Sequence, residues 1–514
     1  MKTLATLEPL TFRLLEVQRI NSAASLLGWD QETYMPAGGG AARADQISTL
    51  QGLAHERLVA PEIETLLRQW IDPASGQAAE NEAEPWDEPS RALLRETWRD
   101  FSRAKKLPSE FVIRLSRECS LAQQAWVTAR EENRFKHLLP HLQTVLSLKR
   151  QEADYLGYTA SPYDALMDVY EPGATVASLN PLLDRLRSGL VPLLKRITAS
   201  PVNIDDGFLY HAYAAGRQLE FGRLVLTAMG YDFERGRLDV SAHPFTTSFH
   251  PTDVRVTTRV FEQELPSCLF SCIHEGGHGL YEQGLDPRHY GTPLGDSVSL
   301  GIHESQSRLW ENCVGRSRPF WRFFYPILQQ TFPHQLKEID LDHFHAGINR
   351  VKPSLIRVEA DELTYNLHIM LRVEIERALI EDRLQPDALP EIWRDKMRQY
   401  LGIEPERDAD GVLQDVHWSM GSFGYFPTYT LGNLYAVQFY EQAKRDIPGL
   451  EDAIASGELT MLRRWLEQKV HRWGRTFPPD RLVERVTGST LQPEPFLRYL
   501  EEKYRRLYRF DSSG

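Results

Sequence analysis

The sequence predicts a mainly α-helical protein with one small β-sheet. Apolar residues recur at three- and four-residue intervals through most of the chain, which is the spacing of one helix face. One stretch, residues 243–260, departs from that spacing and is dense in Thr, Val and Phe instead. The chain has 514 residues, of which 42% are hydrophobic and 25% charged, and this composition is that of a globular protein with a large core.

The helical spacing is clearest in four stretches: residues 10–29, 110–156, 176–197 and 354–380. No apolar run approaches the roughly 18 residues that a membrane-spanning helix needs, and the N-terminus lacks the apolar segment of a signal peptide. The net charge of -12 argues against a nucleic acid or an acidic membrane held by bulk charge. The four cysteines are too few for a disulfide framework in so long a chain. We therefore expect a cytoplasmic protein with no nucleic-acid or membrane partner.

Two segments are predicted to be non-helical. Within residues 243–260 the pattern predicts a β-hairpin, with strands at 245–249 and 253–258 joined by a turn. Residues 411–433 are too rich in Gly, Ser and aromatic residues for a helix, and too apolar for a plain surface loop. A loop of this kind in a helical protein usually lines a functional site.

The stretch "SCIHEGGHGL", residues 271–280, carries a candidate metal site. His274 and His278 are four residues apart, so on a helix they share a face and can both offer imidazole to one Zn²⁺. Glu275 would lie beside a water on that metal and could act as its base. Pro266 and Gly284 give the helix a start and a stop. The alternative is a helix with two unrelated histidines.

A catalytic zinc site needs a third protein ligand and an open fourth position. The helical stretch 299–312 offers His303, Glu304 and Glu311. A Glu from this second helix would complete a His₂Glu site, but the spacing does not choose between the two glutamates, and exposure to solvent is the usual fate of Glu. Co²⁺ or Mn²⁺ could occupy the same ligands.

The arrangement His-Glu-x-x-His at 274–278 is typical of zinc peptidases. A peptidase also needs groups that stabilise an oxyanion and hold the substrate. The aromatic loop offers His417, Tyr425 and Tyr429 for the oxyanion, although each type is also common as a half-buried structural residue. In the strand at 253–258, Arg255 could bind a carboxylate, and the strand could offer an edge to which an extended peptide pairs.

Arg357 is a second candidate for binding a carboxylate. It lies four residues before Asp361 in a stretch with helical spacing, and most such pairs are surface ion pairs worth about 0.2–0.5 kcal/mol. The functional interpretation is that its guanidinium recognises the free C-terminal carboxylate of a peptide by two parallel hydrogen bonds.

The glycines of the metal motif also need an explanation. Gly276 and Gly277 lie between the two histidines, where each weakens the helix by about 0.5–1 kcal/mol relative to Ala. Glycine permits another backbone to approach closely. We expect the hairpin at 243–260 and the loop at 411–433 to be the neighbours that need this space.

Several short motifs occur in order along the chain: "WDQETYMP" at 29–36, "HPF" at 243–245, "DVRVT" at 253–257, "HEGGH" at 274–278, "HES" at 303–305, "IRVEAD" at 356–361 and "GVLQDVHW" at 411–418. Together they resemble the motif set of the M32 metallocarboxypeptidases, also called the carboxypeptidase Taq family. The resemblance spans nearly the whole chain, and no motif departs from the family pattern in a way that would put activity in doubt.

The resemblance implies a fold similar to the neurolysin and angiotensin-converting-enzyme group. Residues 1–514 would form one elongated, mainly helical peptidase domain, with two lobes flanking a central cleft and a small sheet beside the zinc helix. It implies a homodimer with one Zn²⁺ per subunit, and it assigns the third ligand to Glu304. It also implies that peptides with a free C-terminus lose single residues, with broad side-chain preference.

For the oxyanion, the resemblance matches His417 with Tyr425 or Tyr429, and it leaves both tyrosines open. It also leaves open whether Arg255 or Arg357 is the main carboxylate anchor. Two alternatives remain at this point. One is an oligopeptidase or dipeptidase on the same scaffold, and the other is a non-enzymatic helical scaffold stabilised by zinc.

Overall fold

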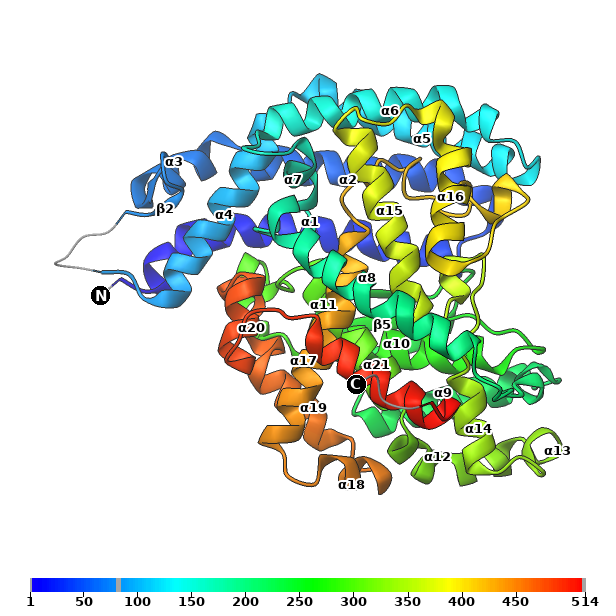
Figure 1. Ribbon diagram of the computed structural model, residues 1–514. Coiled ribbons are helices and arrows are strands. Elements are labelled where there is room, and N and C mark those ends of the chain that lie inside the picture. The colour runs from blue at the N-terminus through cyan, green and yellow to red at the C-terminus, as the bar shows by residue number, and fades with distance from the viewer. Residues whose placement is uncertain (1, 80–84, 511–514) are drawn as a thin grey trace. The chain divides into compact units, whose positions relative to one another are not determined.

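The computed structural model describes residues 2–79 and 85–510, and it is mainly helical, as predicted (Figure 1). The chain divides into two compact units, each assembled from three separate stretches. Unit 1 comprises residues 1–105, 205–348 and 439–490. Unit 2 comprises residues 106–204, 349–438 and 491–514.

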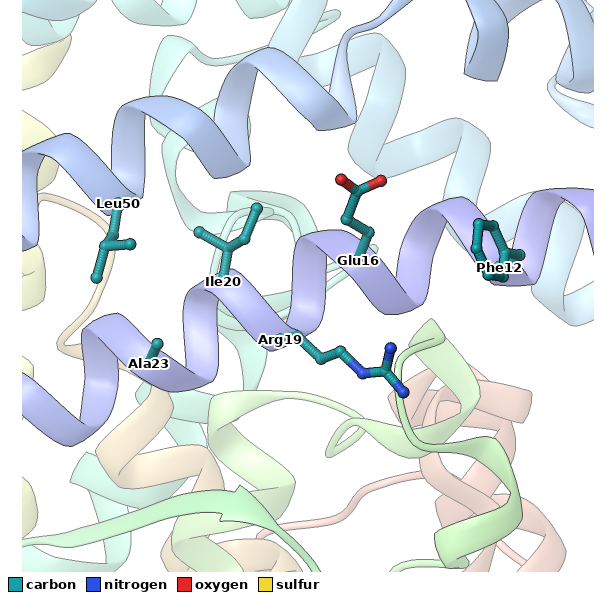
Figure 2. Close-up of a pocket in the computed structure, with 6 residues that line it drawn as sticks. All are labelled: Phe12, Glu16, Arg19, Ile20, Ala23 and Leu50. Atoms are coloured by element: carbon teal, nitrogen blue, oxygen red, sulfur yellow. The ribbon is translucent and has the colours of Figure 1, made fainter.

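Unit 1 begins with α1 (Glu8–Thr33) and α2 (Gly40–Leu58), which pack against each other along their length. Helix α1 confirms the helix predicted at 10–29. A shallow hollow of about 360 Å³ between these helices is lined by side chains that all come from α1 and α2: Phe12, Glu16, Arg19, Ile20, Ala23 and Leu50 (Figure 2). Helices α3 (Pro61–Trp70) and α4 (Glu88–Lys106) cover a small apolar core with the start of α1.

A three-stranded sheet lies in the middle stretch of unit 1. Strands β4 (Thr246–His250) and β5 (Asp253–Thr258) form the predicted antiparallel hairpin. A third strand, β3 (Gly236–Val240), pairs parallel to β5 and gives the order β3-β5-β4. The prediction that β5 offers a free edge to a peptide is therefore wrong, because both of its edges are paired. Strand β4 is an outer strand of the sheet.

Helix α10 (Leu265–Gly284) follows the sheet and carries the "HEGGH" motif. It begins with a proline in its first turn and ends at Gly284, as the sequence predicts. Helix α9 (Ala215–Met229), strand β5 and helix α11 (Leu300–Arg308) all pack against it (Figure 1). Helix α11 runs directly into a π-helical turn, η6 (Leu309–Val314).

The glycines of α10 admit close neighbours, but not the ones the sequence suggests. A β-carbon at Gly277 would lie 2.5 Å from the carbonyl oxygen of Gln306, which belongs to the α11 backbone. A β-carbon at Gly276 would meet the side chains of Leu226 and Met229 on α9. The expected close approach is thus present, while the hairpin and the aromatic loop are the wrong partners for these two positions.

The remaining elements of unit 1 are α12 (Arg318–Thr331), α13 (Pro333–Leu336), α14 (Leu341–Ile348), α18 (Leu450–Ala455), α19 (Thr460–Lys469), α20 (Pro479–Thr487) and the short strands β1 (Ile71–Asp72) and β2 (Gln77–Ala78). Short 3₁₀ turns occur in each unit: η1 (Leu4–Leu7), η2 (Ala37–Gly39), η3 (Gly207–Tyr210), η4 (Pro287–His289), η5 (Pro293–Gly295), η7 (Arg357–Glu359), η8 (Pro386–Ala388), η9 (Asp408–Asp410) and η10 (His471–Thr476).

Unit 2 is built from α5 (Ser109–Glu131), α6 (Phe135–Leu156), α7 (Pro162–Met167), α8 (Val176–Thr198), α15 (Thr364–Ile380), α16 (Leu389–Leu401) and α21 (Glu494–Tyr508). The helix predicted over 110–156 is two helices, because Asn133 adopts a left-handed conformation with φ 54° between them. Helix α8 confirms the helix predicted at 176–197.

Two boundaries in unit 2 differ from expectation. The stretch predicted as helix from 354 starts only at Thr364, and the turn η7 precedes it. The aromatic loop ends at Phe426, because α17 (Pro427–Asp446) begins there, so Tyr429 lies in the first turn of a helix. None of the helices in the described part of the chain is both long and apolar enough to cross a bilayer.

Candidate metal centre

Three side chains of unit 1 converge between α10 and α11. His274 and His278 lie one turn apart on α10, and Glu304 faces them from α11. The Oε2 atom of Glu304 is 3.5 Å from Nε2 of His274 and 3.3 Å from Nε2 of His278. One donor atom from each of the three lies within 4.8 Å of the other two.

This donor set fits a tetrahedral divalent metal. Zinc binds imidazole nitrogen and carboxylate oxygen at about 2.0–2.2 Å, so neighbouring donors around it are separated by roughly 3.3 Å. The two nitrogen–oxygen distances match that separation. Burial above all lowers the pKa of His278 to about 3, so that its imidazole is neutral and has a lone pair for a metal.

Two neighbouring side chains donate hydrogen bonds to the carboxylate of Glu304. Nε of Arg308 donates to Oε1 at 2.7 Å, and the hydroxyl of Ser307 donates to Oε2 at 2.9 Å. Burial opposes ionisation, but Arg308 and the two histidines outweigh it and hold the pKa of Glu304 well below its usual range. The group is therefore an anion, aimed by its neighbours at the two imidazoles.

Glu311, the other candidate from the sequence, has a different position. Its Oε2 accepts a hydrogen bond from Nδ1 of His274 at 2.8 Å, on the opposite side of that ring from Nε2. Arg308 and Arg316 donate to the same carboxylate. Glu311 thus orients an imidazole, a role that carboxylates commonly have behind a metal-binding histidine.

Glu275 is fixed beside the histidines by the sheet. The hydroxyl of Thr246, at the start of β4, donates to Oε2 of Glu275 at 2.8 Å and lies 3.0 Å from its carbonyl oxygen. The side chain is buried, and burial raises the pKa of the Glu275 carboxyl above its usual value. A carboxylate whose pKa is raised towards neutrality is suited to general-base work.

Arg255 lies on β5 in unit 1 and is already paired. Its guanidinium makes two hydrogen bonds to Asp253, at 2.9 and 3.0 Å. It also lies over the ring of Trp29, 4.3 Å from the centroid, and 5.0 Å from that of Phe249. These contacts satisfy both its charge and its planar faces.

Arg357, in unit 2, does not pair with Asp361 as the sequence spacing suggests. The intervening chain is a 3₁₀ turn. The carboxylate of Asp361 instead accepts hydrogen bonds from the backbone N–H groups of Leu363 and Thr364 at the start of α15. Nε of Arg357 donates to Asp415 at 2.9 Å. The surface ion pair predicted as the simpler interpretation is therefore wrong.

Asp415 bridges two arginines in the interior of unit 2. Arg372 on α15 donates to its other oxygen at 2.6 Å. The exposed fractions of the side chains are 8% for Arg357, 0% for Arg372 and 10% for Asp415, so the three carry a net positive charge in a nearly dry environment. A buried uncompensated charge is costly, and an anionic ligand would offset it.

His417 lies near this positive cluster in unit 2. Its Nε2 is 3.3 Å from the hydroxyl of Tyr429, and its ring packs edge-on against Tyr425. Burial first, and then the two nearby arginines, lower the pKa of His417 to about 4 despite the opposing effect of Asp415. Its Nδ1 has no hydrogen-bond partner among the residues that the structure describes.

The loop that carries His417 is tied to α15 by one buried carboxylate. Glu376 accepts hydrogen bonds from Nε1 of Trp418 at 2.9 Å and from the backbone N–H of Gly424 at 3.1 Å. The hydroxyl of Tyr163 donates to it at 2.7 Å. Two of these bonds hold the glycine-rich loop against α15.

Sequence reasoning missed several residues that shape these sites. Arg308 is signalled only by its i,i+4 spacing from Glu304, which resembles any surface pair. Asp415 lies inside the "GVLQDVHW" motif, but nothing in the sequence points to Arg372 as its second partner. Thr246 gives no signal, because its contact with Glu275 depends on how the sheet packs on α10.

Comparison with known proteins places the chain in a family. A family model described as carboxypeptidase Taq (M32) metallopeptidase matches residues 10–504. The chain is 43% identical over 509 residues to thermostable carboxypeptidase 1 of Thermus thermophilus, covering 96% of this chain and 98% of that one. It is 38% identical over 508 residues to carboxypeptidase 1 of Bacillus subtilis, covering 98% and 99%. A solved M32 carboxypeptidase from Deinococcus radiodurans R1 has a TM-score of 0.93 and 40% identity, covering 98% of this chain and 99% of that one.

These matches confirm the resemblance carried by the sequence motifs. The matched residues include both the "HEGGH" helix of unit 1 and the "GVLQDVHW" loop of unit 2. The relatives are named carboxypeptidases, and the family is one of metallopeptidases, which use a divalent metal. The chain therefore belongs to the carboxypeptidase Taq (M32) family of metallopeptidases.

Proposed function

We propose that this chain is a zinc-dependent carboxypeptidase that releases single residues from the C-terminus of peptides, with broad side-chain preference. The observation that carries the proposal is the His₂Glu donor set of unit 1, with Glu275 buried beside it. Residues 1–514 would act as one peptidase domain and assemble as a homodimer, while the cytoplasmic location stays a prediction from the sequence.

The proposed metal ligands are His274, His278 and Glu304. Two nitrogens and one carboxylate oxygen are a set typical of catalytic zinc, although Co²⁺ or Mn²⁺ can bind the same atoms. When bound, zinc lowers the pKa of a water and polarises the scissile carbonyl. The protein's part is to orient the two imidazoles and to keep the carboxylate ionised, and the hydrogen bonds of Arg308 and Ser307 to Glu304 support the ionised form.

Glu275 is the proposed general base. It takes a proton from the attacking water and passes it to the leaving amine as the peptide bond breaks. Thr246 occupies Oε2, and Oε1 has no hydrogen-bond partner among the described residues, so Oε1 is the atom proposed to face the water. The fixed rotamer avoids the cost of ordering the base during the reaction.

Arg357 is the proposed anchor for the C-terminal carboxylate, in preference to Arg255. The net positive charge of the trio Arg357, Asp415 and Arg372 supports this choice, because a substrate carboxylate would compensate it. The charge of Arg255 is already compensated by Asp253, to which its guanidinium donates two hydrogen bonds. The requirement for a free carboxylate would make the enzyme an exopeptidase.

His417 and one tyrosine are the proposed oxyanion stabilisers. The low pKa of His417 keeps it neutral at pH 7, where it acts as a hydrogen-bond donor of fixed orientation. Tyr429 is within hydrogen-bond distance of its Nε2, and Tyr425 packs against its ring, so both tyrosines stay candidates. Changing each tyrosine separately to Phe assigns the role. Only loss of the hydroxyl that contacts the oxyanion should lower kcat, by about 10²- to 10³-fold.

A peptide digest followed by mass analysis tests the proposal. Sequential loss of single C-terminal residues, dependent on added Zn²⁺, is the expected result. Internal cleavage or release of dipeptides would show an oligopeptidase or dipeptidase instead.

The variant Glu275→Gln tests the assignment of the base. It should bind zinc normally and lose turnover, and Glu234→Gln on the surface is the control. Substantial activity in Glu275→Gln would refute the assignment of the base. Sedimentation of the purified protein tests the homodimer.

A further inference from the structure

The two imidazoles of the donor set have different partners behind them. Nδ1 of His274 faces the carboxylate of Glu311 at 2.8 Å. Nδ1 of His278 faces another imidazole, Nδ1 of His303, at 2.5 Å. His303 in turn places its Nε2 2.8 Å from Oε1 of Glu282. The second ligand is therefore linked to its carboxylate through an intervening histidine.

The proton positions in this chain follow from hydrogen-bond chemistry. An ionised carboxylate only accepts, so Nε2 of His303 carries a hydrogen and donates it to Glu282. With that hydrogen on Nε2, Nδ1 of His303 offers a lone pair and is an acceptor. Nδ1 of His278 must carry the hydrogen between the two rings, which leaves its Nε2 as a lone pair, the atom that lies 3.3 Å from Glu304.

The opposite arrangement would disable the ligand. If Nδ1 of His303 carried the hydrogen, Nδ1 of His278 would have to accept it, and the hydrogen of His278 would move to Nε2. A protonated Nε2 has no lone pair for a metal. The identity of the group at 303 therefore decides whether His278 presents a lone pair or a hydrogen to the donor set.

We propose that His303 is a positioning residue that, held by Glu282, fixes the tautomer and the ring orientation of His278 for metal binding. The proposal rests on the proposed function only in that His278 is a metal ligand. Glu282 lies one helical turn after His278 on α10, and His303 lies next to Glu304 on α11, so the relay joins the two ligand-bearing helices.

The surroundings allow substitution without loss of the core. The side chains of His303 and Glu282 are each 17% exposed, and both line a polar cavity of about 340 Å³ that runs along β4. On its other side His303 packs against Tyr281, with ring centroids 5.2 Å apart. A smaller side chain at 303 would enlarge a cavity that already exists.

Three variants separate hydrogen bonding from packing. His303→Asn keeps an acceptor near the position of Nδ1 and loses the bond to Glu282, whereas His303→Leu removes both bonds. His471→Leu is the matched control. His471 is buried, packs on the same Tyr281 ring, and forms its hydrogen bond with Gln306 at 2.9 Å and not with a metal-ligand imidazole.

The primary measurement is the zinc dissociation constant of the full-length protein, obtained by competition with a chromophoric chelator. His303→Leu should weaken zinc binding about 10- to 100-fold, and His303→Asn should recover most of that loss. His471→Leu should lower the melting temperature of the metal-free protein and leave the dissociation constant within about twofold of wild type. The visible absorption of the Co²⁺ form should change in His303→Leu and not in His471→Leu.

Zinc binding by His303→Leu within about twofold of wild type would overturn the proposal, as would equal weakening in His303→Leu and His471→Leu. Failure of the wild-type protein to bind zinc would instead overturn the metal site of the proposed function, and the relay with it. Because the readouts are affinity and spectrum, loss of peptidase activity for another reason does not count as support.

Discussion

Replacing Gly277 by Ala tests how closely the two ligand-bearing helices must approach. The new β-carbon would lie 2.5 Å from the carbonyl oxygen of Gln306 and 2.7 Å from Cα of Ser307, where ordinary contacts begin at 3.4 Å. Both atoms belong to the α11 backbone, so no side-chain rotation relieves the clash. Helix α11 must move away from α10 by about 1 Å.

The expected cost has two parts. Overpacking of this kind typically destabilises a protein by about 1–3 kcal/mol, and the better helix propensity of Ala returns only about 0.5–1 kcal/mol. The displaced helix also carries Glu304, whose Oε2 is now 3.5 and 3.3 Å from the two Nε2 atoms. A functional site tolerates about 0.5 Å of displacement, so metal affinity should fall as well.

Gly276→Ala provides the matched control, one residue away on the same helix. Its β-carbon would meet only the ends of the Leu226 and Met229 side chains, which can rotate aside. Thermal unfolding of the metal-free variants and zinc competition with a chelator measure the two effects. If Gly277→Ala melts no earlier than Gly276→Ala and binds zinc equally well, helix spacing does not set the geometry of the donor set.

Further predictions concern the substrate side, pH and the metal. Arg357→Ala should lower kcat/KM for peptides with a free C-terminus by about 10- to 100-fold, through loss of charge-assisted hydrogen bonds, and Arg255→Ala should have a smaller effect; equal effects would contradict the choice of anchor. The pKa of His417 falls to about 4 on folding. Between about pH 6.5 and 4 the imidazole is therefore protonated in the unfolded chain and neutral in the folded chain. The free energy of unfolding should decrease as the pH falls through this range. In His417→Gln, chemical denaturation at several pH values should show a flatter dependence, by on the order of 2–3 kcal/mol over that range. Chelation should abolish activity reversibly with little change in far-UV circular dichroism; global unfolding would point to structural zinc.

Local spacing was sufficient to predict most of the fold, and long-range pairing was not. Helices α1 and α8 follow from apolar periodicity because one face of each is buried. Strand β3 escaped prediction because its five residues alternate only weakly, and its partner β5 lies beyond an intervening strand. The break at Asn133 was missed because the apolar periodicity continues across it, while a single left-handed residue redirects the chain.

In the candidate site too, the local pattern was predicted and the long-range contacts were not. The i,i+4 histidines are a local pattern, and α10 presents them as expected. Glu304 and Glu311 are seven residues apart, about two helical turns, so spacing puts both on one face and cannot rank them. Packing of α11 on α10 brings Glu304 to the Nε2 atoms and Glu311 to Nδ1 of His274. The ion pair of Arg357 with Asp361 was expected from helical spacing, and it does not form because Arg357 lies in a 3₁₀ turn.

The proposed metal ligands all lie in one short stretch of chain, from His274 to Glu304. In thermodynamic terms, a metal that binds them closes only a small loop, so little chain entropy opposes chelation. Metal and fold are then linked by mass action: a free metal concentration one hundred times the dissociation constant stabilises the folded chain by about 2.7 kcal/mol. The melting temperature of this protein should therefore report the free zinc concentration around it.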